Sequence, residues 1–276
     1  SNDNYFEWRF GNIYYTKKGT GSPILLIHDT LPGASGYEWS KIEDELAIDH
    51  TVYTVDLLGC GRSDKSSITY TNFVYVQMIS DFIKKIIGQK TDVIASGFSG
   101  SFVTMACHNE KELFNKIMLV NPPSLTQLKQ MPNRKDRLLK AALEIPIFGT
   151  LVYHMIVSRD NINNLFIEKM YFNPFHVDNQ MADAYYEAAH KGGYYTRFLY
   201  SSLAAKYINI NICHALKALD NSIYIVEGET EPNGKAVTDD YCASNPAIEV
   251  SVLKETKHLP HVEAPEAFLE QVKIFF

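Results

Sequence analysis

The amino-acid sequence predicts an α/β fold with a mostly parallel sheet. Short, solidly apolar runs recur along the chain without the alternation of apolar and polar residues that marks a strand with one face in water. Segments with helical spacing of apolar residues lie between several of these runs, and strands that alternate with helices are typical of a doubly wound sheet. At 276 residues, 46% of them apolar, the chain is long enough to bury the core of one large domain.

The first half of the chain supplies a hairpin and then strands that alternate with helices. Residues 5–10 and 12–17, on either side of Gly11, carry aromatic and β-branched residues and predict an antiparallel hairpin. Thr71 is a suitable N-cap for a helix in which apolar residues recur every three or four positions. The strands predicted after the hairpin cover residues 24–27, 51–55, 92–95 and 116–120, and the helices predicted between them cover residues 39–46 and 74–87.

In the second half the alternation stops and later resumes. Residues 134–143 and 179–189 are long amphipathic segments in a region rich in Tyr, Phe, Met and Leu. We interpret this region as a helical cap over one edge of the sheet, which divides the chain into a core of residues 1–123 and 220–276 and a cap of residues 124–219. The sheet pattern returns with strands over residues 222–226 and 249–253, and residues 265–276 predict a closing helix with Phe268, Val272 and Phe275 facing inward.

Composition and charge exclude several classes of protein. The 26 Lys and Arg against 32 Asp and Glu give a net charge of −6 without a basic block, which argues against nucleic-acid or membrane partners. Residues 1–10 lack the apolar run of a signal peptide, and the longest apolar stretch, residues 145–157, is too short to span a bilayer. We therefore expect a cytoplasmic protein with no metal or organic cofactor, and the sequence leaves its oligomeric state open. The four cysteines are scattered without metal or redox spacing: Cys60, Cys107, Cys213 and Cys242.

Five short motifs lie at or after the ends of predicted strands. They are His28-Asp29 with Pro32-Gly33, the D-x-x-G-x-G-x-S segment of residues 56–63, the G-x-S turn of residues 97–101, the turn of residues 228–232, and the H-x-x-H-x-E-x-P-x-x-F segment of residues 258–268. In this order they resemble the α/β-hydrolase superfamily over nearly the whole chain. The resemblance implies the α/β-hydrolase fold, with a mostly parallel eight-stranded sheet, flanking helices and a helical cap inserted after the sixth strand.

The resemblance also implies a catalytic triad and an oxyanion hole. His258 corresponds to the base and Glu231 to the acid, and Ser99 is the nucleophile that the G-x-S turn offers, in the chain order Ser, acid, His. Backbone amides after the nucleophile and in the loop from His28 to Thr30 are then the oxyanion donors. The residues expected around this oxyanion and substrate pocket are His28, Asp29, Thr30, Gly97, Phe98 and Gly100.

Two alignments of the elbow are possible, and they differ in the nucleophile. The spacing of 24 positions from Gly97 to Asn121 matches the family without a gap, and it puts a glycine where the nucleophile belongs. The other alignment uses Ser99, which competes with a role of Ser99 as an ordinary helix N-cap. We favour the Gly97 alignment from spacing alone, and among the neighbouring hydroxyls of Ser96, Ser99 and Ser101 we favour Ser99 as the reactive one.

Asp29 is a second departure, because the family carries glycine after the histidine of this loop. A carboxylate beside a developing oxyanion would oppose it, so we expect Asp29 to point away, or the site to do other chemistry. An aspartate-nucleophile dehalogenase or epoxide hydrolase is disfavoured because the elbow holds no carboxylate. Three other residues have structural interpretations: His28 shapes its loop, Asp56 orients local loops, and His261 packs beneath His258.

Three functions remain open at this point. The first is a serine hydrolase with the triad Ser99, His258 and Glu231, acting on a small or medium ester, thioester, amide or C–C bond whose apolar group the aromatic cap selects. The second is a ligand-binding protein with a vacant elbow at Gly97. The third is a lyase or another cofactor-free enzyme that uses His258 and Glu231 as a base dyad. The contact between the Ser99 hydroxyl and the His258 ring distinguishes the first from the others.

Overall fold

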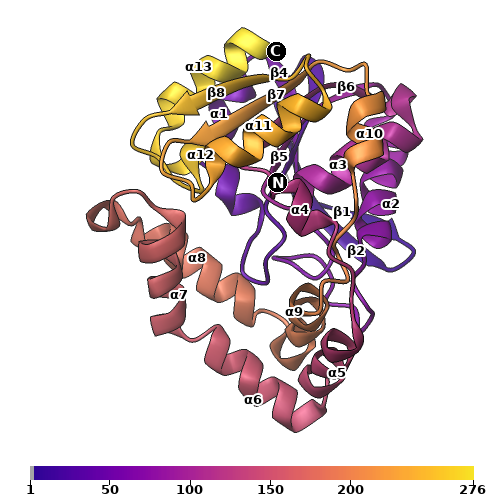
Figure 1. The fold of residues 1–276 in the computed structure, drawn as a ribbon, viewed down its shortest axis with the longest axis vertical. Coiled ribbons are helices and arrows are strands. Elements are labelled where there is room, and N and C mark those ends of the chain that lie inside the picture. The colour runs from indigo at the N-terminus through magenta and orange to yellow at the C-terminus, as the bar shows by residue number, and fades with distance from the viewer. Residues whose placement is uncertain (1–2) are drawn as a thin grey trace.

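The computed structural model describes residues 3–276; residues 1 and 2, which the predicted core includes, lie outside the described residues. Within the described part, eight strands form a sheet in the order β1-β2-β4-β3-β5-β6-β7-β8, with β1 and β2 antiparallel to their neighbours and β3 to β8 parallel (Figure 1). The predicted mostly parallel sheet and the opening hairpin are confirmed. The strands are β1 (Asp3–Trp8), β2 (Gly11–Lys18), β3 (Ser22–Ile27), β4 (His50–Val55), β5 (Thr91–Ser96), β6 (Phe114–Val120), β7 (Ile223–Gly228) and β8 (Glu249–Leu253).

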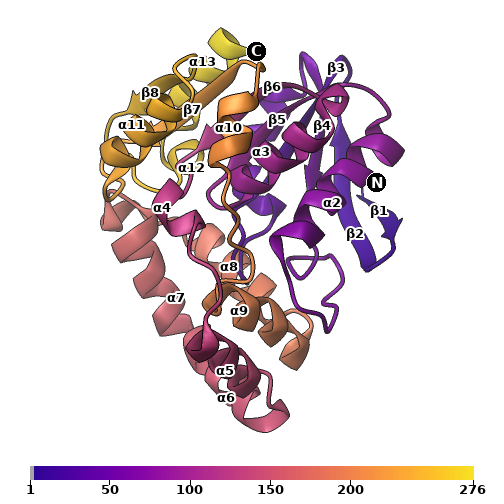
Figure 2. The ribbon, with the colours of Figure 1, turned by 45° about the vertical axis from the view of Figure 1, so that its right-hand side comes forward.

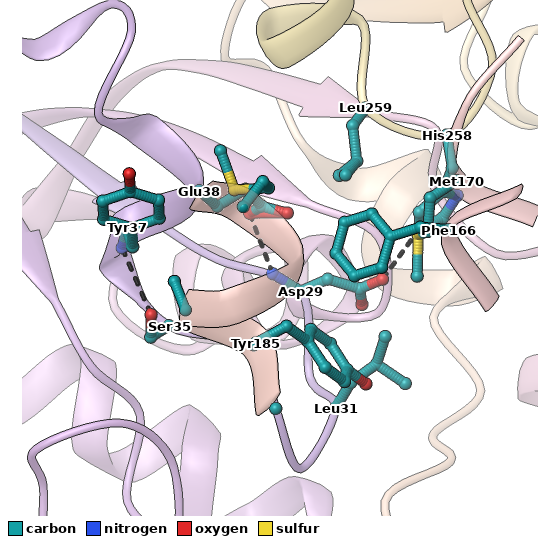
Figure 3. Close-up of a pocket in the computed structure, with 14 residues that line it drawn as sticks. Asp29, Leu31, Ser35, Tyr37, Glu38, Phe166, Met170, Tyr185, His258 and Leu259 are labelled. Atoms are coloured by element: carbon teal, nitrogen blue, oxygen red, sulfur yellow. Dashed lines mark hydrogen bonds and ion pairs between the residues drawn. The ribbon is translucent and has the colours of Figure 1, made fainter. Parts of the chain in front are cut away.

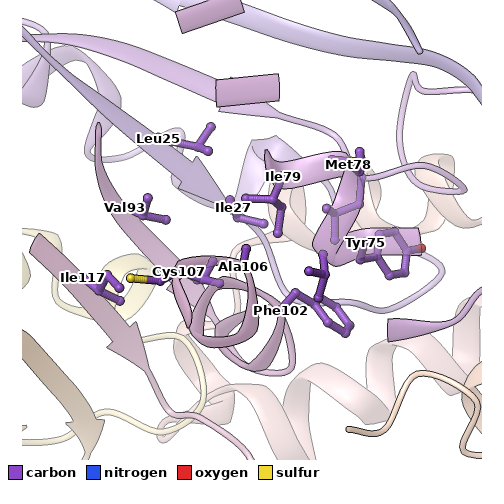
Figure 4. Close-up of a cluster of buried hydrophobic side chains, with 14 of the residues drawn as sticks. Leu25, Ile27, Tyr75, Met78, Ile79, Val93, Phe102, Ala106, Cys107 and Ile117 are labelled. Carbon is purple, nitrogen blue, oxygen red and sulfur yellow. The ribbon is translucent and has the colours of Figure 1, made fainter. Parts of the chain in front are cut away.

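The central strands are apolar throughout because both faces of the sheet are covered. In β3, Leu25 and Ile27 join the core beneath α2 (Asn72–Phe82) and α3 (Ser99–Asn109), while Ile24 and Leu26 join a separate core. That second core lies beneath α1 (Glu43–Leu46) and α13 (Pro265–Phe275) and contains Phe268 and Val272. Figure 4 shows the first core, where side chains of β3, β5 and β6 meet those of α2 and α3. A run without polar alternation is therefore the expected sequence of a doubly covered strand.

Two predicted helices have different forms in the structure. In place of a helix over residues 39–46, the structure has the 3₁₀ turn Gly36–Trp39 and the short helix α1. The apolar spacing is explained by burial, since Trp39, Ile42 and Leu46 are all buried. The helix predicted over residues 74–87 begins at Asn72 and is capped by Thr71 as expected, since the Thr71 side chain accepts a hydrogen bond from the Val74 N–H. Its last turn, Ile83–Ile87, is a π-helix, and the chain leaves it at Gly88 with φ of +73°.

A helical insertion, which we define as residues 125–218, connects β6 to β7. Its cluster around Tyr153, Phe166 and Met181 also takes in Leu259 and Val262, while its first and last helices join the main core. Figures 1 and 2 show residues 134–204 extending away from the sheet, whereas residues 213–218 lie beside α3. The predicted helices over residues 134–143 and 179–189 are present as α5 and α8, whereas the exact boundaries of the predicted cap stay a prediction. The helices are α4 (Leu125–Leu128), α5 (Arg134–Leu143), α6 (Pro146–Ile156), α7 (Arg159–Leu165), α8 (Asn179–His190), α9 (Arg197–Ala204) and α10 (Cys213–Ala218).

The remaining helices follow β7 and β8 and lead to the C-terminus. They are α11 (Gly234–Ser244), α12 (Pro260–Glu263) and α13. Among the described residues, the structure contains no single helix of the length and apolarity that a membrane span requires. The pair α5 and α6 meets these criteria only when taken together, and its two helices are bent by 95° at the break between them.

Candidate active site

The loops that leave the carboxyl ends of β3, β5, β7 and β8 converge at one edge of the sheet. Parallel strands direct their carboxyl ends to the same edge, where open α/β sheets place their sites. Ile27 of β3 is paired with Ala95 of β5. Two residues beyond this pair, the segments that follow the two strands reach Asp29 and Gly97. These two positions therefore lie side by side although they are distant in the sequence.

The predicted acid and base come together. Nδ1 of His258 donates a hydrogen bond to Oε2 of Glu231 over 2.9 Å. The side-chain amide of Asn121, at the end of β6, donates to the carbonyls of Lys257 and His258 over 2.8 and 3.0 Å, which holds the histidine loop against the sheet. The imidazole is thus oriented from behind by a carboxylate, as in a catalytic triad.

The other ring nitrogen of His258 contacts a residue that the triad interpretation did not expect. Nε2 donates to Oδ2 of Asp29 over 2.8 Å. Ionised carboxylates only accept hydrogen bonds, so an imidazole between two of them carries a proton on both nitrogens. Burial alone lowers the pKa of His258, but the hydrogen bonds and negative charges of Asp29 and Glu231 outweigh it and raise this pKa well above its usual value.

The second oxygen of Asp29 lies where the predicted oxyanion hole would hold a substrate oxygen. Oδ1 accepts hydrogen bonds from the Thr30 N–H over 2.7 Å and from the Phe98 N–H over 3.0 Å, and these are two of the amides expected to hold an oxyanion. Burial raises the pKa of Asp29, but the His258 ring and these two amides prevail and lower it below its ordinary value. The expectation that Asp29 points away is therefore wrong, and its alternative, other chemistry, remains.

Gly97 forms the sharp corner between β5 and α3. Its φ is +55°, in the left-handed region that glycine enters without strain, and its N–H is bonded to the Val120 carbonyl over 2.8 Å. A Cβ at position 97 would lie 2.3 Å from Cγ and Oδ1 of Asp29. The carboxylate of Asp29 therefore fills the space in which a side chain of the elbow would begin, and any side chain at Gly97 would displace it.

Ser99 lies in the first turn of α3 and is fully buried. Its hydroxyl donates to the His28 carbonyl over 2.5 Å and is 2.9 Å from Oγ1 of Thr30. The contact that would mark Ser99 as the nucleophile is absent from the described residues, because Nε2 of His258 is hydrogen-bonded to Asp29. The N-cap alternative is wrong, because the Ser99 side chain caps no backbone amide.

The other elbow residues have partners away from His258. The Ser96 hydroxyl donates to Glu38 over 3.2 Å, and the Ser101 hydroxyl donates to the Phe98 carbonyl over 2.7 Å. A Cβ at Gly100 would lie 3.0 Å from the Leu119 side chain, so this glycine allows α3 to pack closely on β6. In the part of the chain that the structure describes, no serine hydroxyl is hydrogen-bonded to the His258 ring.

Residues around Asp29 hold its loop in place. His28 donates from Nδ1 to the Asp29 carbonyl over 2.6 Å and accepts at Nε2 from the Leu57 N–H over 3.0 Å, which fits its predicted structural role. Glu38, a buried residue that the sequence interpretation missed, accepts from the Asp29 N–H over 3.3 Å. Nothing in the sequence around Glu38 distinguishes it from a surface carboxylate.

Asp56 and His261 have partners in the framework around the site, and the predicted packing of His261 beneath His258 stays a prediction. Asp56 accepts hydrogen bonds from the Gly36 and Arg62 amides, each within 2.8 Å, and so ties two loops together. His261 is fully buried and stacks on Trp39 with 4.3 Å between the ring centres. Both residues therefore belong to the framework of the site.

Two cavities meet at Asp29 and His258, which alone among the described residues line both. The apolar cavity, about 40 Å³, lies against the helical insertion and is walled by Leu31, Phe166 and Tyr185 (Figure 3). The polar cavity, about 310 Å³, lies on the other side, and its remaining walls include Gly97, Phe98, Asn121, Glu227 and Glu231. The described residues contain no group of three or more His, Cys, Asp or Glu arranged to hold a metal ion.

Comparison with known proteins relates the chain to hydrolases. The model of a family described as "Alpha/beta hydrolase family" matches residues 24–271. A 2-hydroxy-6-oxo-6-(2'-aminophenyl)hexa-2,4-dienoic acid hydrolase of Metapseudomonas resinovorans is 29% identical over 113 residues, 40% of this chain and 39% of that protein. A soluble epoxide hydrolase of Corynebacterium sp. (strain C12) is 24% identical over 109 residues, 40% of this chain and 37% of that protein. The chain thus matches less than half the length of either relative.

Solved structures agree over a longer span. A meta-cleavage product hydrolase from Pseudomonas fluorescens IP01 superposes with a TM-score of 0.79 at 18% identity, covering 99% of this chain and 97% of that one. At this identity the likeness establishes the fold alone. The α/β-hydrolase fold predicted from the five motifs is confirmed.

Proposed function

Because the chain belongs to the α/β-hydrolase family, we propose that it is a small-molecule hydrolase whose chemistry is done by the Asp29–His258–Glu231 centre, and that Ser99 takes no part in bond cleavage. The observation that carries the proposal is the 2.8 Å contact between His258 Nε2 and Asp29 Oδ2. A serine mechanism needs an activated hydroxyl within about 3 Å of the base. Here the atom beside the base is a carboxylate oxygen.

The centre combines an acid with a buried anion. His258, protonated between two carboxylates, is a proton donor, and Asp29 is the group that faces the apolar cavity together with it. Glu231, whose side chain is 20% exposed, orients the imidazole from the polar cavity. Two carboxylates in unlike environments take unlike roles, as in other acid–base sites. The apolar cavity accordingly favours a substrate with an apolar group.

The similar proteins support a small-molecule substrate of this kind. These two relatives are named as hydrolases of a substituted hexadienoic acid and of epoxides, so both names refer to small organic molecules. The match covers less than half of each relative, so the bond that this chain cleaves is part of the proposal. In the alternative function, a lyase, the same His258 and Glu231 would transfer protons in a reaction that does not consume water.

A ligand-binding protein without catalysis is the second candidate. The glycine at the elbow and the filled oxyanion hole favour it, because a fully satisfied carboxylate in that hole blocks acyl transfer as long as it stays there. In that case the ion pair of Asp29 and His258 serves only to hold the pocket together.

A labelling and turnover experiment separates these functions. We expect a fluorophosphonate probe to leave Ser99 unmodified. The test substrates are 4-nitrophenyl esters, a 2-hydroxy-6-oxohexa-2,4-dienoic acid and styrene oxide. We expect the wild type to turn over at least one of them and Ser99→Ala to retain that turnover. His258→Ala should lose it by about 10²- to 10⁴-fold, the usual effect of removing a general acid–base. A fluorophosphonate adduct on Ser99 that requires His258 would establish the serine hydrolase instead. Saturable binding of these compounds without turnover would establish the ligand-binding protein.

A further inference from the structure

Asp29 is held as a nucleophile needs to be held, although it comes from the loop after β3 and not from the elbow after β5. Its Oδ1 is fixed by two backbone amides, and its Oδ2 faces His258 and the cavities. Its Cγ lies 2.3 Å from the position that a Cβ of residue 97 would occupy. A carboxylate from the end of β3 thus lies where a side chain of the elbow after the neighbouring strand β5 would begin.

We propose that Asp29 is a covalent nucleophile, and that its Oδ2 attacks a ring carbon of a small apolar epoxide to form an ester on the enzyme. This inference rests on the proposed function, because it assigns a reaction to the same Asp29–His258–Glu231 centre. It goes beyond that function by naming a covalent intermediate and the class of substrate.

In the first step one bond forms and one breaks. The Oδ2 lone pair forms a C–O bond to the ring carbon, and the electron pair of the broken ring C–O bond goes to the ring oxygen. That oxygen takes the proton from Nε2 of His258, which leaves a hydroxyalkyl ester of Asp29 and a neutral imidazole. An epoxide fits the resting centre because its leaving oxygen needs a proton, and the centre at rest offers a nucleophile and an acid but no free base.

The second step uses the change in charge that the first step makes. An ester at residue 29 carries no charge, so His258 loses one of the two carboxylates that raise its pKa and becomes a base. It takes a proton from water, whose oxygen bonds to Cγ of Asp29. The negative charge then develops on Oδ1, which already lies 2.7 and 3.0 Å from the amide nitrogens of Thr30 and Phe98.

Collapse of this adduct restores the enzyme. The bond from Cγ to the substrate oxygen breaks, the departing alkoxide takes the proton from His258, and the new carboxyl group returns its own proton to the imidazole. The starting pair of Asp29 carboxylate and His258 imidazolium is regenerated. The sum is one epoxide and one water converted to one diol, with no other reactant.

The two cavities give each reactant a side of its own. The apolar cavity reaches Asp29 and His258 beneath the helical insertion and suits the compact apolar substituent. The polar cavity reaches the same two residues from the side of Glu231 and suits water. A substrate held in the first cavity therefore leaves the second open for the hydrolytic step.

The test uses enzyme in excess over styrene oxide in oxygen-18 water, followed by mass spectrometry of the peptide that contains Asp29. We expect the first diol formed to carry only oxygen-16 and Asp29 to gain oxygen-18, because the enzyme's own oxygen leaves in the product. Asp29→Asn, which keeps the shape of the side chain but not its charge, should form neither diol nor adduct. Asp160→Asn, which changes an exposed carboxylate of the helical insertion, should behave as wild type.

Two results would overturn the inference. Turnover in which the first diol contains oxygen-18 and Asp29 does not would make Asp29 a proton acceptor, and the proposed function would survive. The absence of any Asp29 ester or diol with styrene oxide, 1,2-epoxyhexane and cyclohexene oxide would also refute the covalent step. Turnover of the 4-nitrophenyl esters and of the 2-hydroxy-6-oxohexa-2,4-dienoic acid would still test the proposed function independently of the epoxides.

Discussion

The two carboxylates that contact His258, Glu231 and Asp29, differ in their exposure and in the number of hydrogen bonds they accept. Glu231 makes one contact with the ring, from a loop beside the polar cavity, and its side chain is 20% exposed. Asp29 has a side chain that is 8% exposed and accepts two backbone N–H groups in addition to the ring. One carboxylate orients the imidazole, and the other is itself positioned by the protein. Asp29, for which we propose the reactive role, is therefore the more tightly held of the two.

The largest effect should come from moving the proposed reactive group from position 29 to the elbow. In the double variant Asp29→Gly with Gly97→Ser, the space that the carboxylate fills becomes free for a serine side chain at the corner. We expect fluorophosphonate labelling at position 97 where the wild type shows none, because His258 and Glu231 are already in place. If the folded double variant stays unlabelled, the two positions are not equivalent and the comparison fails.

Gly97→Ala alone should destabilise the protein without giving it a nucleophile. A Cβ at position 97 would overlap the Asp29 carboxylate, and the alanine would have to adopt the left-handed backbone conformation of Gly97. We expect a loss of roughly 3 kcal/mol or more in the free energy of unfolding. Gly88→Ala is the matched control, because Gly88 also has positive φ but a Cβ there meets nothing within 4 Å. It should cost about 1–2 kcal/mol in urea denaturation. Equal losses for both variants would contradict the overlap.

The pH dependence of stability should change on both sides of neutrality. The raised pKa of His258 stabilises the fold fully below its unfolded value of about 6.5, and this contribution disappears as the pH rises through the folded pKa. The lowered pKa of Asp29 stabilises the fold above its unfolded value of about 3.9, and this contribution disappears as the pH falls through the folded pKa.

At pH values between the unfolded pKa of Asp29 and the unfolded pKa of His258, both groups of the ion pair are charged in the folded protein. Above about pH 6.5 the unfolded His258 loses its proton while the folded His258 keeps it, so the free energy of unfolding should decline as the pH rises. Urea denaturation at a series of pH values measures this decline. Asp29→Asn should flatten the curve, whereas Ser99→Ala should keep its shape. A wild-type curve that already lacks the decline would remove the imidazolium from the account.

The smallest effect belongs to Ser99. Its hydroxyl is buried and holds the His28 carbonyl and Thr30, so Ser99→Ala should cost about 1–2 kcal/mol of stability through lost hydrogen bonds. Turnover per folded molecule should change less than about threefold, well below the effect of removing a general acid–base. A loss of turnover as large as that of His258→Ala would return Ser99 to the reactive centre.

Much of the fold was predictable because buried strands and family motifs leave local signals. The apolar runs located six parallel strands within a few residues, and the motif of residues 258–268 identified His258. The helix predicted over residues 39–46 is shorter in the structure, where a 3₁₀ turn and a four-residue helix bury the same apolar residues.

The contact of Asp29 with His258 was not predictable in the same way. The position of Asp29 depends on the pairing of Ile27 with Ala95, which places two distant loops side by side. The available signal was that two departures occur together, since a carboxylate appears at position 29 where the family has glycine, and a glycine appears at position 97 where it has the nucleophile. Glu38 left no signal of this kind.

The most direct test is the protonation state of His258, measured by nitrogen-15 NMR of histidine-labelled protein over a pH series. We predict an imidazolium with protons on both ring nitrogens at pH values above the usual histidine range. Its titration midpoint should fall in Asp29→Asn and stay unchanged in Ser99→Ala. A neutral imidazole near neutral pH, with a midpoint that moves in Ser99→Ala and not in Asp29→Asn, would contradict this prediction.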